Sequence, residues 1–181
     1  MGKMEKGLVQ IFYGNGRGKT TAALGTALRA CGSGLSVHLI QFMKNGASSL
    51  DEQIPSEIKS LSRFENFSFI RFGAGEWVID KNKSIHAAEI EKAIAHAKEA
   101  LSEKYDVIIA DEILYAVQLG LLSEEQVIEL INSKPRDKEL ILTGSHKPLP
   151  KIFEAADLVS EVRKIKHQYD IGVLARKGID Y

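Results

Sequence analysis

Short apolar runs alternate with helix-like stretches along most of this chain. Several runs, such as DVIIAD, are apolar throughout, as expected for strands that are buried on both faces of a sheet. The strand candidates are 8–13, 36–42, 67–72, 106–111, 139–144 and 158–162, and the helix candidates lie near 19–31, 50–61, 84–103, 123–133 and 148–156. This alternation predicts an α/β fold, a single domain over residues 1–181 with a mainly parallel sheet and helices on both faces.

The first strand candidate leads into a glycine-rich turn, GNGRGKTT, that opens the first helix candidate. Glycine allows backbone conformations in which successive N–H groups face phosphate oxygens, and the positive end of the helix dipole adds to this attraction. Lys19 supplies a charge for the outer phosphates, and the Thr20 hydroxyl suits a Mg²⁺ ion. The pattern predicts a P-loop NTPase site of the RecA-like type; a glycine turn without a ligand is the alternative. The nucleotide-binding residues expected are Gly14, Asn15, Gly16, Arg17, Gly18, Lys19, Thr20 and Thr21.

The loop is a variant of the common pattern G-x-x-x-x-G-K-[ST]. Tyr13 stands where that pattern has its first glycine, and Arg17 adds a cation within the loop. The strand, the Lys-Thr pair and the helix nevertheless occur in the order that phosphate binding requires. The chain is therefore expected to bind a nucleoside triphosphate.

Two carboxylates follow the fourth strand candidate, at the end of the sheet where ligands of such folds bind. Asp111 and Glu112 come directly after four apolar residues. One carboxylate holds Mg²⁺ directly or through water in such sites, while the other orients water or substrate. Thr20, Asp111 and Glu112 are thus the expected metal-binding residues, and Lys19 and Glu112 the expected catalytic residues. The alternative is an acidic helix cap.

Other polar and aromatic residues also follow strand candidates, and each has two interpretations. Gln41 either bonds a ligand or faces water at the edge of a strand. Glu76 and Trp77 lie in a glycine-containing loop; the tryptophan either covers a flat ligand or serves as a core or interface residue. Lys166 and His167 either contact polyphosphate or belong to a solvated hairpin edge.

Charge and composition narrow the range of partners and locations. The chain of 181 residues carries 24 basic and 24 acidic residues, so no excess of one sign favours nucleic acid or a membrane surface. Its single cysteine, Cys31, excludes an internal disulfide and a multi-cysteine metal site. The first residues, MGKMEKG, are short and charged and do not resemble a signal peptide. No apolar run reaches membrane-spanning length. A cytoplasmic protein without nucleic-acid or membrane partners is expected.

Several segments together resemble the corrinoid adenosyltransferases of the CobA/BtuR type. The similarity covers nearly the whole chain and is most specific in the tail, which generic P-loop ATPases do not share. The matching segments are GNGRGKTTAALGTALRACGSG (14–34), VHLIQFMK (37–44), DEILYAVQLGLLSEEQVIELI (111–131), LTG (142–144) and ADLVSEVRKIKHQYDIGVLARKGIDY (156–181).

The resemblance implies a reaction and a set of ligands. Such enzymes transfer the 5′-deoxyadenosyl group of ATP to the cobalt(I) of a reduced corrinoid and release triphosphate. ATP, Mg²⁺ and a corrinoid are then the expected ligands, with an electron-donating flavoprotein and a second copy of the chain as partners. Trp77, Glu76 and Gln41 are the expected corrinoid-binding residues, although one aromatic residue stands where the fuller pattern of the family has two.

Two other classes of function remain open from the sequence. A P-loop ATPase or kinase acting on another substrate shares the loop and the carboxylate pair, but it does not explain the tail. A non-catalytic nucleotide- or corrinoid-binding protein is compatible with the reduced aromatic loop. Phosphate release without corrinoid favours the first, and tight binding without turnover favours the second.

Overall fold

The computed structural model describes residues 4–44, 54–74 and 82–180, and the strands in these ranges form one parallel sheet in the order β3-β2-β4-β5-β1-β6. The strands are β1 (Val9–Tyr13), β2 (Val37–Gln41), β3 (Phe67–Arg71), β4 (Val107–Asp111), β5 (Glu139–Thr143) and β6 (Leu158–Glu161). The helices are α1 (Lys19–Gly32), α2 (Ser56–Leu61), α3 (Lys83–Ser102), α4 (Ile113–Gln118), α5 (Glu124–Asn132) and α6 (Pro150–Glu154), followed by a short 3₁₀ helix, η2 (Gln168–Ile171). The α/β class and the parallel sheet predicted from the sequence are confirmed.

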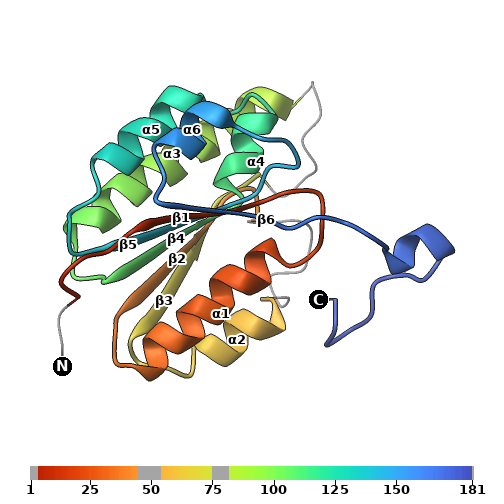
Figure 1. Cartoon of the computed structure of the whole chain (residues 1–181), viewed down its shortest axis with the longest axis horizontal. Helices are drawn as coiled ribbons and strands as arrows, with labels where there is room; N and C mark the ends of the chain where they lie inside the picture. The colour runs from red at the N-terminus through yellow and green to blue at the C-terminus, as the bar shows by residue number, and fades with distance from the viewer. Residues whose placement is uncertain (1–3, 45–53, 75–81, 181) are drawn as a thin grey trace.

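Helices cover both faces of the sheet and bury a core on each side. Figure 1 shows α1 and α2 beneath the sheet and α3, α4, α5 and α6 above it. Neighbouring residues of the central strands face opposite sides: Ile108 joins the core under α3, whereas Ile109 joins the core over α1. This two-sided burial explains why the central strands are apolar without alternation. None of the described helices is long and apolar enough to cross a membrane.

Two helical elements were not among the sequence-based expectations. Helix α4 begins directly after β4, because Glu112 adopts a left-handed conformation with φ 65° and turns the chain back at once. α4 has six residues, and Ile113, Leu114 and Ala116 are buried, so its sequence shows no alternation of polar and apolar positions from which a helix is predicted. η2 lies in the C-terminal segment. Helix α2 begins at Ser56 rather than at residue 50, and residues 50–53 of that expectation lie outside the described ranges.

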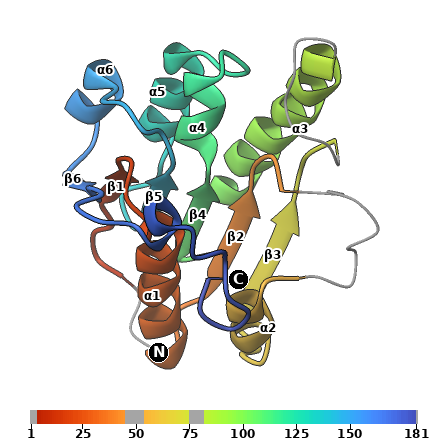
Figure 2. The same cartoon turned by 90° about the vertical axis from the view of Figure 1, so that its right-hand side faces the viewer.

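The strand order brings together segments that are distant in the sequence. β5 lies between β4 and β1, and β2 lies on the other side of β4. The register pairs Phe12 with Thr143 and Gln41 with Asp111. Figure 2 shows the strands pointing the same way, so their carboxyl ends share one edge of the sheet. The glycine-rich loop, the carboxylate pair, Thr143 and Gln41 therefore meet there.

Candidate active site

The loop between β1 and α1 curls around the ammonium group of Lys19. Gly14 and Gly18 have φ of 114° and 119°, which residues with a side chain rarely adopt. Lys19 Nζ donates to the carbonyl oxygens of Gly14 at 2.7 Å and Gly16 at 3.0 Å. Burial lowers the pKa of Lys19, while the charges of Glu112 and Asp111 oppose that shift. The lysine is thus held over the loop by two neutral carbonyl oxygens, and a charged phosphate oxygen would be a stronger acceptor.

Two of the loop's N–H groups bond to other parts of the protein. Gly14 N–H donates to the carbonyl of Ser145 at 2.9 Å, and Gly16 N–H donates to that of Val162 at 2.7 Å. Asn15 Oδ1 accepts from the N–H of Lys164 at 3.0 Å. Gly14 and Asn15 therefore support the loop from outside, whereas the loop from Gly16 onward faces the adjacent pocket.

Asp111 is the centre of a buried polar cluster beneath the loop. Its side chain is fully buried, and its Oδ1 accepts from the hydroxyls of Thr20 at 2.8 Å and Thr143 at 2.7 Å. Gln41 Nε2 donates to Asp111 Oδ2 at 2.9 Å. The carboxylate ties α1, β2, β4 and β5 together. Among the described residues, Gln41 Oε1 is a buried acceptor without a hydrogen-bond donor.

Glu112 lies beside this cluster with its carboxylate at the pocket. Its N–H donates to the Thr143 hydroxyl at 2.9 Å, and its Oε1 lies 3.8 Å from Lys44 Nζ. Burial, and to a smaller extent the charge of Asp111, raises the pKa of Glu112, while Lys44 and Lys19 oppose the shift. The carboxylate is thus costly to keep ionised until a cation comes close.

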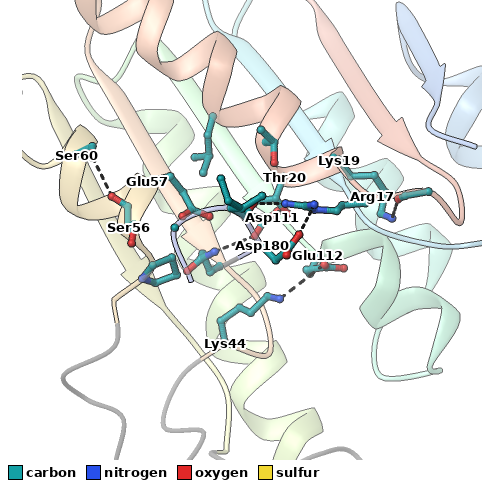
Figure 3. A pocket seen from close by; sticks show the side chains of 18 residues that line it. Arg17, Lys19, Thr20, Lys44, Ser56, Glu57, Ser60, Asp111, Glu112 and Asp180 are labelled. Carbon is teal, nitrogen blue, oxygen red and sulfur yellow. Dashed lines mark hydrogen bonds and ion pairs between the residues drawn. The ribbon is translucent and has the colours of Figure 1, made fainter. Parts of the chain in front are cut away.

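A pocket of about 650 Å³ joins these groups (Figure 3). The expected residues Gly16, Arg17, Gly18, Lys19, Thr20, Thr21, Gln41, Asp111 and Glu112 line it. It is also lined by residues that the sequence did not single out: Leu24, Lys44, Pro55, Ser56, Glu57, Ser60, Gly178, Ile179 and Asp180. Ser56, Glu57 and Ser60 belong to α2, whose position beside the pocket follows from tertiary packing. The one signal for the last three was that the tail carries the most specific part of the family pattern.

The remaining expected residues lie apart from this pocket or outside the described ranges. Lys166 and His167 do not line it. Lys166 is exposed, and His167 Nδ1 accepts from the N–H of Tyr169 at the start of η2. Glu76 and Trp77 lie outside the described residues. The structure therefore brings the expected metal residues and the loop residues from Gly16 to Thr21 to one pocket. Gly14, Asn15 and the two expected phosphate contacts of the tail do not line it.

The donor set at the pocket suits a hard cation shared with phosphate. Thr20, Asp111 and Glu112 offer oxygen atoms, which Mg²⁺ prefers, and Mg²⁺ usually takes few protein ligands together with substrate phosphates. Over the described ranges, no three His, Cys, Asp or Glu side chains gather as a metal cage. The residues present thus fit a magnesium ion that arrives with a nucleotide.

Comparison with known proteins places the chain in a family. A solved structure titled EssC (ATPases 2 and 3) from Geobacillus thermodenitrificans aligns at a TM-score of 0.48 and 16% identity, over 97% of this chain and 36% of that chain. The corrinoid adenosyltransferase of Escherichia coli and the corrinoid adenosyltransferase CobA of Salmonella typhimurium are each 36% identical over 98% of this chain and 87% of their own length. The family model described as ATP:corrinoid adenosyltransferase BtuR/CobO/CobP matches residues 5–181. The chain therefore belongs to the BtuR/CobO/CobP family of ATP:corrinoid adenosyltransferases.

Proposed function

We propose that this chain transfers the 5′-deoxyadenosyl group of ATP to the cobalt(I) of a reduced corrinoid and releases triphosphate. The observation that carries the proposal is the pocket in which Lys19 and Thr20 of the loop face the carboxylate of Glu112. It suits a polyphosphate with a cation, and the family to which the chain belongs acts on ATP and a corrinoid.

The reaction asks the protein for position and charge rather than for a nucleophile. Cobalt(I) supplies the electron pair of the new Co–C bond, the C5′–O bond of ATP breaks, and its electron pair leaves on the triphosphate. Negative charge therefore grows on the leaving group in the transition state. Lys19 is placed to stabilise that charge by exchanging the carbonyls of Gly14 and Gly16 for phosphate oxygens.

A magnesium ion is part of this proposal. Thr20 and Glu112 would hold it, with Asp111 behind them fixing the Thr20 hydroxyl. When bound, the ion neutralises charge on the triphosphate. Gln41 Oε1, which accepts no hydrogen bond from the residues that the structure describes, lies next to Asp111 and offers an acceptor for a water of this site.

The corrinoid side of the site rests on fewer observations. Gln41 remains a proposed corrinoid-binding residue, although its bond to Asp111 places it at the base of the nucleotide pocket. Glu76 and Trp77 stay proposals from the sequence. A homodimer and an electron-donating flavoprotein are likewise proposed from the resemblance to the family, and cytoplasmic location is proposed from the sequence.

Replacing the loop lysine tests the proposed chemistry. Lys19→Ala should lower kcat/KM for adenosyl transfer by about 10²–10³-fold, because a donor to the developing charge is lost. The measurement is the initial rate of triphosphate release with ATP, Mg²⁺ and cob(I)alamin under anaerobic conditions.

Lys92→Ala is the matched control, since Lys92 is an exposed lysine of α3 paired with Glu89 at 2.6 Å. It should retain the rate of the unmodified protein. An unchanged rate in Lys19→Ala would contradict the role of the lysine. Steady phosphate release from the unmodified protein without corrinoid would instead favour an ATPase.

A further inference from the structure

The segment after β6 runs along the outside of the loop between β1 and α1, residues 14–18, which we call the phosphate loop. Besides the bond from Gly16 N–H to Val162, the N–H of Val162 donates to the carbonyl of Tyr13 at 2.7 Å. A Cβ at Gly16 would lie 2.7 Å from the Val162 carbonyl oxygen, so the backbones of the two segments are in close contact. Figure 2 shows the later part of this blue segment passing in front of α1. The segment then brings Gly178, Ile179 and Asp180 into the pocket wall.

Asp180 is the residue that closes this segment on itself. Its carboxylate accepts from Arg176 N at 2.8 Å, from Arg176 Nε at 3.0 Å and from Gln168 Nε2 at 3.2 Å. Only 5% of its side chain is exposed. The hydrogen bonds from Arg176 hold the pKa of Asp180 below its usual value. Asp180 is therefore a hydrogen-bonded carboxyl group whose ionised form is favoured by its neighbours.

The same carboxylate also holds the cation of the loop. Arg17 pairs through Nη1 with Asp180, and its Nη2 donates to the carbonyl of Ile179 (Figure 3). A guanidinium carries its N–H donors in a rigid planar fork, so two acceptors on one side fix its plane and leave the other donors available. Arg17 is 44% exposed at its side chain and lines the pocket, so a ligand there can reach those donors.

We propose that Asp180, with the carbonyl of Ile179, is a positioning residue that holds the Arg17 guanidinium ready to bind the triphosphate of ATP. This deepens the proposed function and rests on it for the identity of the ligand. Asp180 also accepts hydrogen bonds from Arg176 and Gln168, so its carboxylate stays in position when a phosphate binds to Arg17. A donor that is fixed beforehand loses less conformational freedom on binding than a free arginine.

The proposal makes a prediction opposite to that of simple charge repulsion. If Asp180 only repels phosphate or competes with it for Arg17, removing the charge of Asp180 should strengthen triphosphate binding. If Asp180 positions Arg17, Asp180→Asn should instead weaken the binding of inorganic triphosphate by about tenfold, the scale of one charge-assisted hydrogen bond. Calorimetric titration with magnesium and inorganic triphosphate measures this without corrinoid and without turnover.

Two further variants separate positioning from general effects. Asp170→Asn removes the same charge from the same segment, but Asp170 pairs with Lys164 at 3.1 Å and does not line the pocket. Its affinity should stay within about twofold of that of the unmodified protein. In an Arg17→Gln background, Asp180→Asn should have little further effect on triphosphate affinity, because the arginine through which Asp180 acts is already gone. A double-mutant cycle measures this coupling.

Hydrogen exchange of residues 164–180 in the unmodified protein gives a second test that needs no variant to fold. Triphosphate should leave this segment as protected as before, or more so. Unchanged or tighter triphosphate binding in Asp180→Asn, additive effects with Arg17→Gln, or faster exchange on adding triphosphate would each overturn the proposal. If triphosphate binds as expected but no adenosyl transfer occurs, the proposed function fails while the positioning role of Asp180 stands.

Discussion

Within the ranges that the structure describes, three residues with side chains adopt left-handed backbone conformations at the edge of the sheet that carries the pocket. Met43, Glu112 and Ser145 have φ of 57°, 65° and 53°, and they follow β2, β4 and β5. Such conformations are uncommon outside glycine and cost free energy that the surrounding structure must supply. At Glu112 the same turn directs the N–H to Thr143 and leaves the carboxylate at the pocket. The strained residues thus lie at the edge of the sheet that carries the pocket.

The ionisation of Glu112 gives a pH-dependent prediction about stability. Because its pKa in the folded protein is raised above the ordinary 4.5, the folded state binds this proton more tightly than the unfolded state does. Its effect on stability is therefore favourable below pH 4.5 and is lost as pH rises through the raised value. In metal-free protein at pH 7, Glu112→Gln should melt at a higher temperature than the unmodified chain, and the difference should shrink toward pH 4.5.

Thermal melts between pH 4 and pH 8 measure this difference. Added Mg²⁺ with triphosphate should raise the melting temperature of the unmodified protein more than that of Glu112→Gln, since binding to the folded state alone stabilises it. A difference that stays constant with pH would show that the carboxyl is not destabilised by burial.

At the level of single residues, the sequence predicted which side chains meet, but not the hydrogen bonds that hold them. Lys19, Thr20, Asp111 and Glu112 were expected in one site, and the structure brings them to one pocket. Their roles as nucleotide and metal ligands stay predictions. The bonds of Thr143 to Asp111 and Glu112 depend on β5 lying beside β4, which no local pattern reveals.

The phosphate loop and the segment after β6 act as one packed element. Gly16 lies against the backbone of Val162 and Arg163, and a Cβ there would be 2.7 Å from the Val162 oxygen and 2.8 Å from the Arg163 carbonyl carbon. Its lack of a side chain is thus required by packing, beyond any phosphate contact. The sequence alone attributes this glycine to phosphate binding, because the segment that lies against it is distant in the chain.

Replacing this glycine should destabilise the protein. Gly16→Ala is expected to lower the free energy of unfolding by about 1–3 kcal/mol, since backbone must move to admit the methyl group. Gly25→Ala is the matched control: Gly25 lies within α1 with no atom near its added Cβ, and alanine there should stabilise by about 0.5–1 kcal/mol. Urea unfolding of both variants measures the difference. Equal stabilities would contradict the close packing of loop and tail.

At the scale of the whole molecule, the alternation of apolar runs and helix-like segments was enough for the class of fold. Each strand candidate became a strand within a residue or two, because buried parallel strands are continuous apolar runs. The order of the strands could not be predicted from their patterns, which are nearly alike. α2 and residues 178–180 were missed as pocket walls for the same reason, since their contribution depends on the tertiary arrangement. The resemblance to the adenosyltransferase family is confirmed over residues 5–181.

The proposed function requires that this molecule forms a cobalt–carbon bond from ATP. The most direct measurement is the absorbance spectrum of cob(I)alamin mixed anaerobically with the purified chain, ATP and Mg²⁺, followed by exposure to light. We expect a shift to the spectrum of an alkylcobalamin that reverts on illumination and that does not arise when ATP is omitted. No shift, in a protein that still binds ATP, would contradict it.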